Sequence, residues 1–332
     1  MKIIQVPTGK IFVIDGEYGK LECLSLGDYG KEQNVKADFL GISRELNGVP
    51  NGEVQPLSKK WVVTISSQYG CSMNCKFCCV PKVGPGGNAT FHDMNRQVMT
   101  ALTMEPCHET DRLNVHYARM GEPTFNFAVI GHAEKLKAFV GNMITAKTVH
   151  PVVSTMLPRM NSRLSDFLML WCNVKNDLYA GEAGLQFSIN STSDSQRKEM
   201  FSGNSLSLAE IAKLGEALPM PVGRKYALNF ALADGYEIEA KKLASLFDPQ
   251  KFMVKITPMH NTKACIDNNI KTTDGYSYFT PYKGAEEELK AAGFDVLVFV
   301  PSLDEDEGLI TCGNAILSGT DPRTPYAVVR ID

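Results

Sequence analysis

Apolar, mostly β-branched runs recur from about residue 60 onward, and each is followed by a stretch in which apolar residues stand three and four apart. Short apolar runs bounded by turn residues are typical of buried strands, and the wider spacing predicts amphipathic helices. The predicted strands cover residues 61–68, 113–121, 150–156, 184–191, 225–234, 252–260 and 295–302. The predicted helices cover residues 89–104, 127–146, 159–175, 193–217, 236–248 and 283–293.

Strands that alternate with helices form right-handed βαβ units around a parallel sheet. Six or seven such units in a row predict an α/β fold, in the form of a partial (β/α)6-type, TIM-like barrel. Residues 1–30 differ, because they contain the short strand-like runs "KIIQV", "KIFVID" and "KLECLSL", followed by a polar segment with the loop "NGVPNG". We therefore predict a small β-rich N-terminal extension over residues 1–58 and the barrel over residues 59–332.

Composition narrows the class of protein. No apolar run approaches the roughly 20 residues needed to span a bilayer, and the N-terminus carries charges too early for a signal peptide. These features predict a cytoplasmic protein without a membrane partner. Nine cysteines, several of them bunched, favour metal or redox chemistry in a reducing compartment over a disulfide framework. A net charge of −3 gives no support for a nucleic-acid-binding surface.

The bunched cysteines lie in "SSQYGCSMNCKFCCV", directly after the first barrel strand. Loops at this end of parallel barrel strands carry the chemistry. Thiolates hold zinc or iron–sulfur clusters, and a structural zinc site needs four ligands. Cys71, Cys75 and Cys78 supply three, with spacing C-x3-C-x2-C, because the adjacent Cys79 points elsewhere. Three ligands leave a metal position open, as catalysis requires. A zinc knuckle completed by His92 is the alternative, and iron and sulfide content distinguishes the two.

The cysteine spacing resembles that of the radical S-adenosylmethionine superfamily. Further motifs resemble one group within it, the RlmN/Cfr family, whose members methylate ribosomal adenosine at ring carbon 2 or 8. The motifs follow the family's order and span about residues 61–319. They are "SSQYGCSMNCKFC" (66–78), "MGEP" (120–123), "VST" (153–155), "FSINSTSDSQR" (187–197) and "DEGLITCGNAILSG" (306–319).

The resemblance implies that Cys71, Cys75 and Cys78 bind a 4Fe–4S cluster whose open iron chelates the amine and carboxylate of S-adenosylmethionine. An electron from a donor such as flavodoxin or ferredoxin then cleaves the sulfonium and yields a 5′-deoxyadenosyl radical. It further implies a methyltransferase with RNA or a nucleotide as substrate. The oligomeric state is not readable from the sequence.

The resemblance also implies a set of cofactor-binding residues near the strand ends: Gly121, Glu122, Ser154, Ser188, Asn190 and His260. Glu122 would accept hydrogen bonds from the ligand's ammonium group, with Gly121 allowing a close backbone approach. The two serines would bind the methionyl carboxylate or ribose. Asn190 stands where most members have His, and His260 stands where they have a cofactor-binding Asn. Turn capping is the ordinary alternative for polar residues at strand ends.

Cys312 lies in the C-terminal motif "TCGNAILSG". In the family this cysteine is methylated by one S-adenosylmethionine, and the radical from a second attacks that methyl group. The resulting carbon radical adds to the adenine ring. A thiol suits both steps, because it accepts a methyl group by displacement and its sulfur leaves when the adduct is resolved.

The sequence departs from the family in three respects. Thr64 occupies the position of a second cysteine that helps break the protein–RNA adduct, and Cys79 or Cys23 would have to replace it. "DEDE" at 304–307 stands where the family has basic residues. The first 60 or so residues do not look like the family's RNA-binding domain. Three hypotheses remain: an RlmN/Cfr-like methyltransferase, a radical enzyme acting on a small molecule or peptide without methyl transfer, and a non-catalytic iron–sulfur or zinc module.

Overall fold

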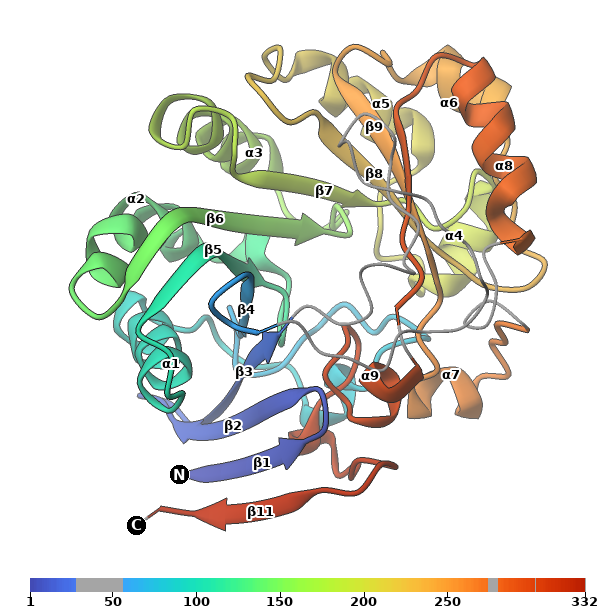
Figure 1. Cartoon of the computed structure of the whole chain (residues 1–332). Helices are drawn as coiled ribbons and strands as arrows, with labels where there is room; N and C mark the ends of the chain where they lie inside the picture. The colour runs from blue at the N-terminus through green and yellow to red at the C-terminus, as the bar shows by residue number, and fades with distance from the viewer. Residues whose placement is uncertain (28–55, 274–279, 302, 332) are drawn as a thin grey trace.

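One curved sheet of eleven strands runs through the chain, in the order β10-β9-β8-β7-β6-β5-β4-β3-β2-β1-β11 (Figure 1). The structure is a computed structural model that describes residues 1–27, 56–273, 280–301 and 303–331. Strands β4 to β10 are parallel, and each corresponds to a predicted strand. They are β4 (Trp61–Ile65), β5 (Glu109–Tyr117), β6 (Thr145–Thr155), β7 (Gly184–Ser188), β8 (Tyr226–Leu232), β9 (Phe252–Pro258) and β10 (Val296–Val298).

The remaining strands are antiparallel and extend the same sheet beyond β4. They are β1 (Lys2–Val6), β2 (Gly9–Asp15), β3 (Lys20–Gly27) and β11 (Ala327–Arg330). β3 pairs with β4, so the predicted N-terminal strands join the parallel strands edge to edge. The boundary at residue 58 between an extension and a barrel stays a prediction. The outer strands β10 and β11 are not neighbours in the order, so the described strands form a sheet that does not close on itself.

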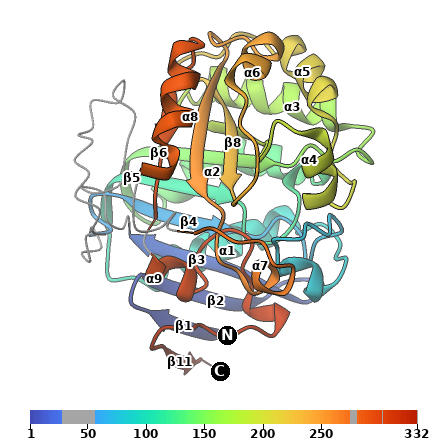
Figure 2. The ribbon, with the colours of Figure 1, turned by 90° about the vertical axis from the view of Figure 1, so that its right-hand side faces the viewer.

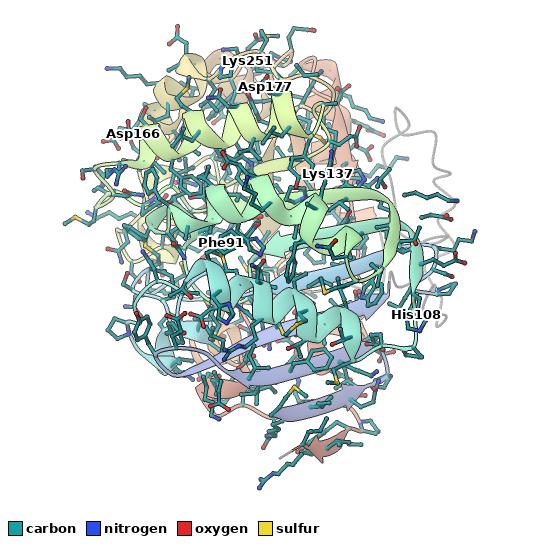
Figure 3. All side chains as sticks on the ribbon, turned by 90° about the vertical axis from the view of Figure 1, so that its left-hand side faces the viewer. Phe91, His108, Lys137, Asp166, Asp177 and Lys251 are labelled. Atoms are coloured by element: carbon teal, nitrogen blue, oxygen red, sulfur yellow. The ribbon has the colours of Figure 1, made fainter. Side chains whose placement is uncertain are left out.

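Helices cover the outer face of the curved sheet, as Figures 1 and 2 show. In Figure 3 three of them lie in a row, marked by Phe91 on α1, Lys137 on α2 and Asp166 on α3. Within the described ranges no helix combines the length and the apolar character needed to cross a membrane. The helices on this face are α1 (Phe91–Thr103), α2 (Ala128–Gly141), α3 (Leu164–Asn173), the π-helical turn η4 (Val174–Leu178), α4 (Asp194–Met200), α5 (Leu208–Ala217), α6 (Ala240–Leu246) and α8 (Thr280–Ala291).

Short helices were harder to predict than long ones. The single helix predicted over 193–217 is wrong: α4 and α5 are separate, because Ser202 (φ 53°) and Gly203 (φ 74°) adopt left-handed backbone angles between them. Periodicity cannot detect elements of three to five residues. These are α7 (Lys263–Asp267), α9 (Leu303–Glu307), η2 (Val80–Val83), η3 (Pro123–Phe125) and η5 (Ile316–Ser318).

Two helix ends show the residue types that favour them. Ser207 caps α5 in a capping box with Glu210. Gly293 (φ 95°) follows α8, where its N–H donates to the Lys290 carbonyl and that of Phe294 donates to the Leu289 carbonyl. This pair of bonds is a Schellman motif, which satisfies carbonyls that the helix leaves unpaired.

Successive side chains along the strands point to opposite faces of the sheet, and the two faces differ in burial. Every second residue is buried against the helices, including Val63, Val115, Phe187, Leu228 and Val254. Because side chains alternate between faces, the residues between them face the inner side of the curve. Several of those residues are polar and partly exposed, including Thr64, His116, Ser188, Asn229 and Lys255. The inner face therefore carries polar side chains that solvent reaches, and the outer face is the core.

Candidate functional site

The cysteine loop follows β4 and is fixed by its own backbone. The Cys71 N–H donates to the Gly84 carbonyl at 3.1 Å, and the Lys76 N–H donates to the Met200 carbonyl at 2.9 Å. A Cβ atom at Gly70 would lie 1.9 Å from the Gly84 carbonyl oxygen, so only glycine fits there. These contacts fasten the loop to its own far end and to α4.

The thiols of Cys71, Cys75 and Cys78 lie near one another and near that of Cys312. Burial raises the pKa of Cys75, and the neighbouring charges of Cys78 and Cys71 raise it further. Burial likewise raises the pKa of Cys78, followed by the charges of Cys312 and Cys71. Packing supports this grouping, because Cys71 and Cys75 lie against one apolar cluster. A Cβ atom at Gly313, next to Cys312, would lie 3.8 Å from the Cys78 Cα, so the two loops are in contact. All nine cysteines are free thiols.

This donor set suits a cluster better than a single metal ion. Among the described residues, no group of three or more His, Cys, Asp or Glu side chains is placed to hold one ion. His92, the fourth ligand of the zinc alternative, is exposed on α1, with Nε2 3.4 Å from an Arg96 nitrogen. A cubane distributes its thiolate ligands over several irons. Three thiols around a common space fit it and leave one corner without a protein ligand.

Soft, apolar side chains surround the thiols. The Cys75 Sγ lies 3.4 Å from the Met156 Sδ. Phe77 packs edge-on against Phe201 with ring centroids 5.8 Å apart. Methionines from separate segments also meet here, and their spacing in the sequence gives no sign of it. The buried methionines beside the loop are Met73, Met156, Met200 and Met259.

Glu122 lies at the end of β5, beside the cysteine loop. Its carboxylate is 4% exposed and accepts hydrogen bonds from the Thr124 N–H (3.1 Å), the Thr124 hydroxyl (2.7 Å) and the Met156 N–H (3.0 Å). Burial raises the pKa of Glu122, and these bonds lower it. A carboxylate offers about four acceptor positions. Glu122 therefore joins the ends of β5 and β6 and keeps capacity for the ligand ammonium that the sequence predicts.

Gly121 packs so closely against Gln68 that a larger residue at this position should destabilise the protein. It has φ 99°, and a Cβ atom there would lie 2.6 Å from the Gln68 side chain and 2.9 Å from its backbone nitrogen. Gly121→Ala is expected to lower the free energy of unfolding by about 1–3 kcal/mol, measured by urea denaturation. Gly131→Ala on α2 is the control. No atom lies within 4 Å of its new Cβ, so stability should rise by about 0.5–1 kcal/mol. Equal stability of the two variants would contradict the prediction.

The polar residues predicted at the strand ends differ in whether their side chains are free to bind a ligand. Ser154 and Ser188 face the inner side, are partly exposed, and make no side-chain hydrogen bond within the described residues. Asn190 is 2% exposed, with φ 60°, and its Oδ1 accepts the Ala231 N–H at 3.0 Å. The serine hydroxyls can therefore reach a ligand directly, whereas the Asn190 side chain is engaged with the protein. All three ligand roles stay predictions.

Cys312 lies on a C-terminal loop that reaches the cysteine loop. The Cys79 N–H donates to the Gly313 carbonyl at 2.7 Å. The Cys312 thiol is exposed, yet the protein atoms around it raise its pKa, while the charges of Arg119 and Lys255 act to lower it. The loop that carries Cys312 is therefore held against the cysteine loop, and its thiol remains accessible.

His260 contacts the C-terminal segment through Asp306. Its Nδ1 lies 2.9 Å from the Asp306 carboxylate, which is fully buried and also accepts the Asn261 N–H at 2.7 Å. Asp306 belongs to the acidic run that the sequence predicts to repel phosphate unless it faces away. Here this carboxylate is turned inward and bonds α9 to the segment before α7. A cofactor-binding role of His260 stays a prediction.

Comparison with known proteins finds relatives of this chain by sequence. No protein-family model matches the chain. The dual-specificity RNA methyltransferase RlmN of Sorangium cellulosum is 24% identical over 269 residues, covering 80% of this chain and 64% of the relative. That of Aliarcobacter butzleri is 25% identical over 232 residues, covering 68% and 55%. The chain thus spans less than two thirds of these relatives.

A solved structure supports the same relationship at the level of the fold. A radical SAM methyltransferase from Sphaerobacter thermophilus superposes with a TM-score of 0.56 and 16% identity, over 92% of this chain and 77% of that one. This chain is therefore similar in sequence to RlmN RNA methyltransferases and similar in fold to this methyltransferase. The α/β fold predicted from the sequence is therefore confirmed, with a mixed sheet, and the partial barrel stays a prediction.

A buried ion pair fastens the Cys312 loop of this RlmN-like chain. Arg119 donates to the Glu22 carboxylate at 2.7 and 2.9 Å, and the two side chains are 1% and 0% exposed. Arg119 also donates to the Leu309 carbonyl at 2.8 Å, and Glu22 accepts the Leu317 N–H at 2.6 Å. The pair thus holds the loop on both sides of Cys312. Sequence reasoning missed it, because Glu22 and Leu317 are 295 positions apart.

Removing one partner of this pair should destabilise the protein. Glu22→Gln leaves the Arg119 charge buried without its counter-charge, so the free energy of unfolding should fall by roughly 3–5 kcal/mol. Urea denaturation measures the change. Lys20→Ala, which breaks an exposed pair with Asp15, is the control and should cause no measurable loss. A Glu22→Gln variant as stable as this control would show that the pair is not needed.

Neither Cys23 nor Cys79, the two predicted substitutes for the second cysteine of the family, is accessible in the described part of the chain. Thr64 faces the inner side of β4 opposite His116 of β5. Cys23 and Cys79 are fully buried, and burial raises the pKa of Cys23 far above that of a free thiol. Within this structure neither thiol is exposed for reaction with an adduct at Cys312.

Proposed function

We propose that this RlmN-like chain is a radical S-adenosylmethionine methyltransferase that methylates a carbon atom of an aromatic ring, with Cys312 as the methyl carrier. One observation carries the proposal: the loop of Cys312, from the far end of the chain, contacts the cysteine loop, where the Cys79 N–H donates to the Gly313 carbonyl at 2.7 Å. The names of the curated relatives, RNA methyltransferases, support it. The preferred substrate is an adenine, in RNA or in a nucleotide.

The residues divide into two groups by chemistry. Cys71, Cys75 and Cys78 would hold a 4Fe–4S cluster, which when bound supplies the electron that cleaves S-adenosylmethionine. The exposed hydroxyls of Ser154 and Ser188 and the carboxylate of Glu122 would bind the polar groups of that ligand. Methionine side chains beside Cys75 exclude water from this region. An external donor of the flavodoxin or ferredoxin class would provide the electron.

Cys312 would accept a methyl group by displacement. A bond forms between its sulfur and the methyl carbon as the bond from that carbon to the sulfonium sulfur breaks. The electron pair stays with the departing sulfur, and the thiol proton is lost to solvent. The positive charges of Arg119 and Lys255 favour the thiolate that this step needs. The Arg119–Glu22 pair holds the loop while it reacts.

A second candidate is a radical enzyme that acts on a small molecule or peptide without methyl transfer. Thr64 favours it, because a hydroxyl neither forms a disulfide nor ionises as a thiol does. The burial of Cys23 and Cys79 also favours it, since neither can resolve an adduct on Cys312 in this structure.

One experiment separates the candidates. Reduced, oxygen-free protein is incubated with methyl-labelled S-adenosylmethionine, and peptides are analysed by mass. Label on Cys312 is the expected result. Formation of 5′-deoxyadenosine without label on the protein would favour the second candidate. Absence of cleavage, in protein that contains iron and sulfide, would leave only a non-catalytic binding module.

A further inference from the structure

Arg197 is a buried arginine on α4 that bonds to the end of β7. It is 2% exposed. One of its terminal nitrogens donates to the Ser188 carbonyl at 3.2 Å and also to the Ile189 carbonyl. The other terminal nitrogen donates to the Ser205 hydroxyl at 2.7 Å and to the Leu206 carbonyl at 3.1 Å. Arg197 therefore joins the end of β7 to the segment that precedes α5.

The same arginine reaches the end of β6 through Ser205. The Ser205 hydroxyl, which accepts from Arg197, donates to the carbonyl of Met156 at 2.6 Å. The Met156 N–H donates to the Glu122 carboxylate at 3.0 Å, and the Met156 Sδ lies 3.4 Å from the Cys75 Sγ. A chain of hydrogen-bonded residues therefore connects Arg197 to the carboxylate that is predicted to bind the ligand ammonium, and it passes beside a predicted cluster ligand.

The turn that follows α4 holds the cysteine loop. The Ser202 hydroxyl donates to the Asn74 carbonyl at 2.6 Å, and the side-chain amide of Asn204 donates to the Met73 carbonyl at 2.9 Å. In Figure 2, α4 and this turn lie next to the cyan segment that contains the cysteine loop. The element that carries Arg197 therefore contacts both the loop of the predicted cluster and the strand ends of the predicted ligand site.

Arg197 bonds to neutral oxygens rather than to an acid. Asp194, whose charge acts on that of Arg197, accepts the Leu208 N–H at 2.8 Å. Burying a charge without a bonded counter-charge is costly, and an apolar side chain of similar size would fill the space at lower cost. An apolar side chain could not bond to oxygens of two segments at once, as a planar guanidinium does with its fixed N–H directions. The residue type therefore favours a positioning role over a packing role.

We propose that Arg197 is a positioning residue that fixes the cysteine loop relative to the residues predicted to bind S-adenosylmethionine. This assignment rests on the proposed function. Glu122 and Ser188 would bind different polar groups of one ligand, and the same ligand would reach the open metal corner beside the cysteine loop. These contacts can form together only if β5, β7 and the loop keep their spacing. A displacement of about 1 Å in such a site can lower a rate about a hundredfold.

Isothermal titration calorimetry of the full, iron-loaded chain with S-adenosylmethionine, without oxygen, tests the proposal. Without a reductant the ligand is not cleaved, so the heat reports binding alone. Arg197→Met and Arg197→Lys should each weaken binding roughly tenfold or more, because the strand ends and the loop lose their common contact. Iron content should stay at the native level in both variants. Lysine keeps the charge but lacks the planar fork, so Arg197→Lys separates positioning from charge.

Lys175→Met is the matched control. Lys175 is also a buried cation that bonds to a neutral oxygen, the Val222 carbonyl, at 2.6 Å. Val222 precedes β8, so this contact lies at the opposite edge of the sheet from the predicted ligand residues. The variant should bind S-adenosylmethionine within about twofold of the native chain, because distant sites act independently. Urea denaturation of all variants shows whether any loss of binding merely follows a loss of stability.

A milder variant keeps the test decisive if the arginine variants do not fold. Ser205→Ala breaks the same chain at one hydroxyl and should weaken binding about threefold, the value of one neutral hydrogen bond. Native-like binding by Arg197→Lys or by Ser205→Ala would overturn the positioning role, as would an equal loss of binding in Lys175→Met. Absence of binding by the native chain, in protein that contains iron and sulfide, would instead overturn the proposed function.

Discussion

Cys312→Ala is expected to abolish transfer of labelled methyl groups from S-adenosylmethionine to the protein, because no other exposed thiol is available among the described residues. Cleavage to 5′-deoxyadenosine depends on the cysteine loop and not on this side chain, so it should persist. Peptide mass analysis measures the first activity and chromatography of the nucleoside measures the second. The separation of the two activities is what a methyl carrier, as opposed to a structural cysteine, should show.

Cys107→Ser is the matched control for this experiment. Cys107 is half-buried in the segment between α1 and β5, where its thiol donates to the Glu109 carbonyl at 3.1 Å. Its replacement should leave both activities unchanged. Retention of methyl label in Cys312→Ala protein would show that another residue accepts the methyl group, and the assignment of Cys312 would then fail.

The pH dependence of methyl incorporation gives an independent check on Cys312. The thiolate is the nucleophile, and burial raises the pKa of this thiol. The reactive fraction is therefore small near neutral pH and should increase as the pH rises through the range of ordinary thiols. A rate that does not change across this range would be inconsistent with the Cys312 thiolate as acceptor.

Cys75→Ala is expected to cause the largest loss of metal. Native protein prepared without oxygen should contain about four irons and as many sulfides per chain, and the variant should contain almost none. Cys75 is the middle ligand of the loop, and its neighbours Cys71 and Cys78 alone cannot hold a cubane. Iron and sulfide analysis and the visible absorption of the protein measure the loss. Cleavage of S-adenosylmethionine should disappear with the iron.

The control for metal binding is again Cys107→Ser, which removes a thiol outside the site and should keep the full iron content. Cys79→Ser is a second and stricter comparison, because Cys79 adjoins the loop but is fully buried. Native protein that binds one zinc ion and no iron would refute the cluster, together with the radical chemistry that depends on it.

Much of the fold followed from local patterns. The strands from β4 to β10 were predicted, because each is a short apolar run whose alternate residues meet the helices. The Ser207 cap and the glycine after α8 are likewise local signals. The division between α4 and α5 was missed, since Ser202 is not glycine and nothing in its type announces a left-handed angle.

The sequence by itself determined the chemistry of the donors, because three thiols with fixed spacing fall in one loop after a strand and must lie near each other in any fold of this class. Only the tertiary structure decided which other residues lie near these three thiols. Cys312, Met156, the Arg119–Glu22 pair and the inward-facing Lys255 come from distant segments that carry no shared pattern. Their proximity depends on the curvature of the sheet, which brings β3, β5 and β9 around one interior, and no local preference encodes that curvature.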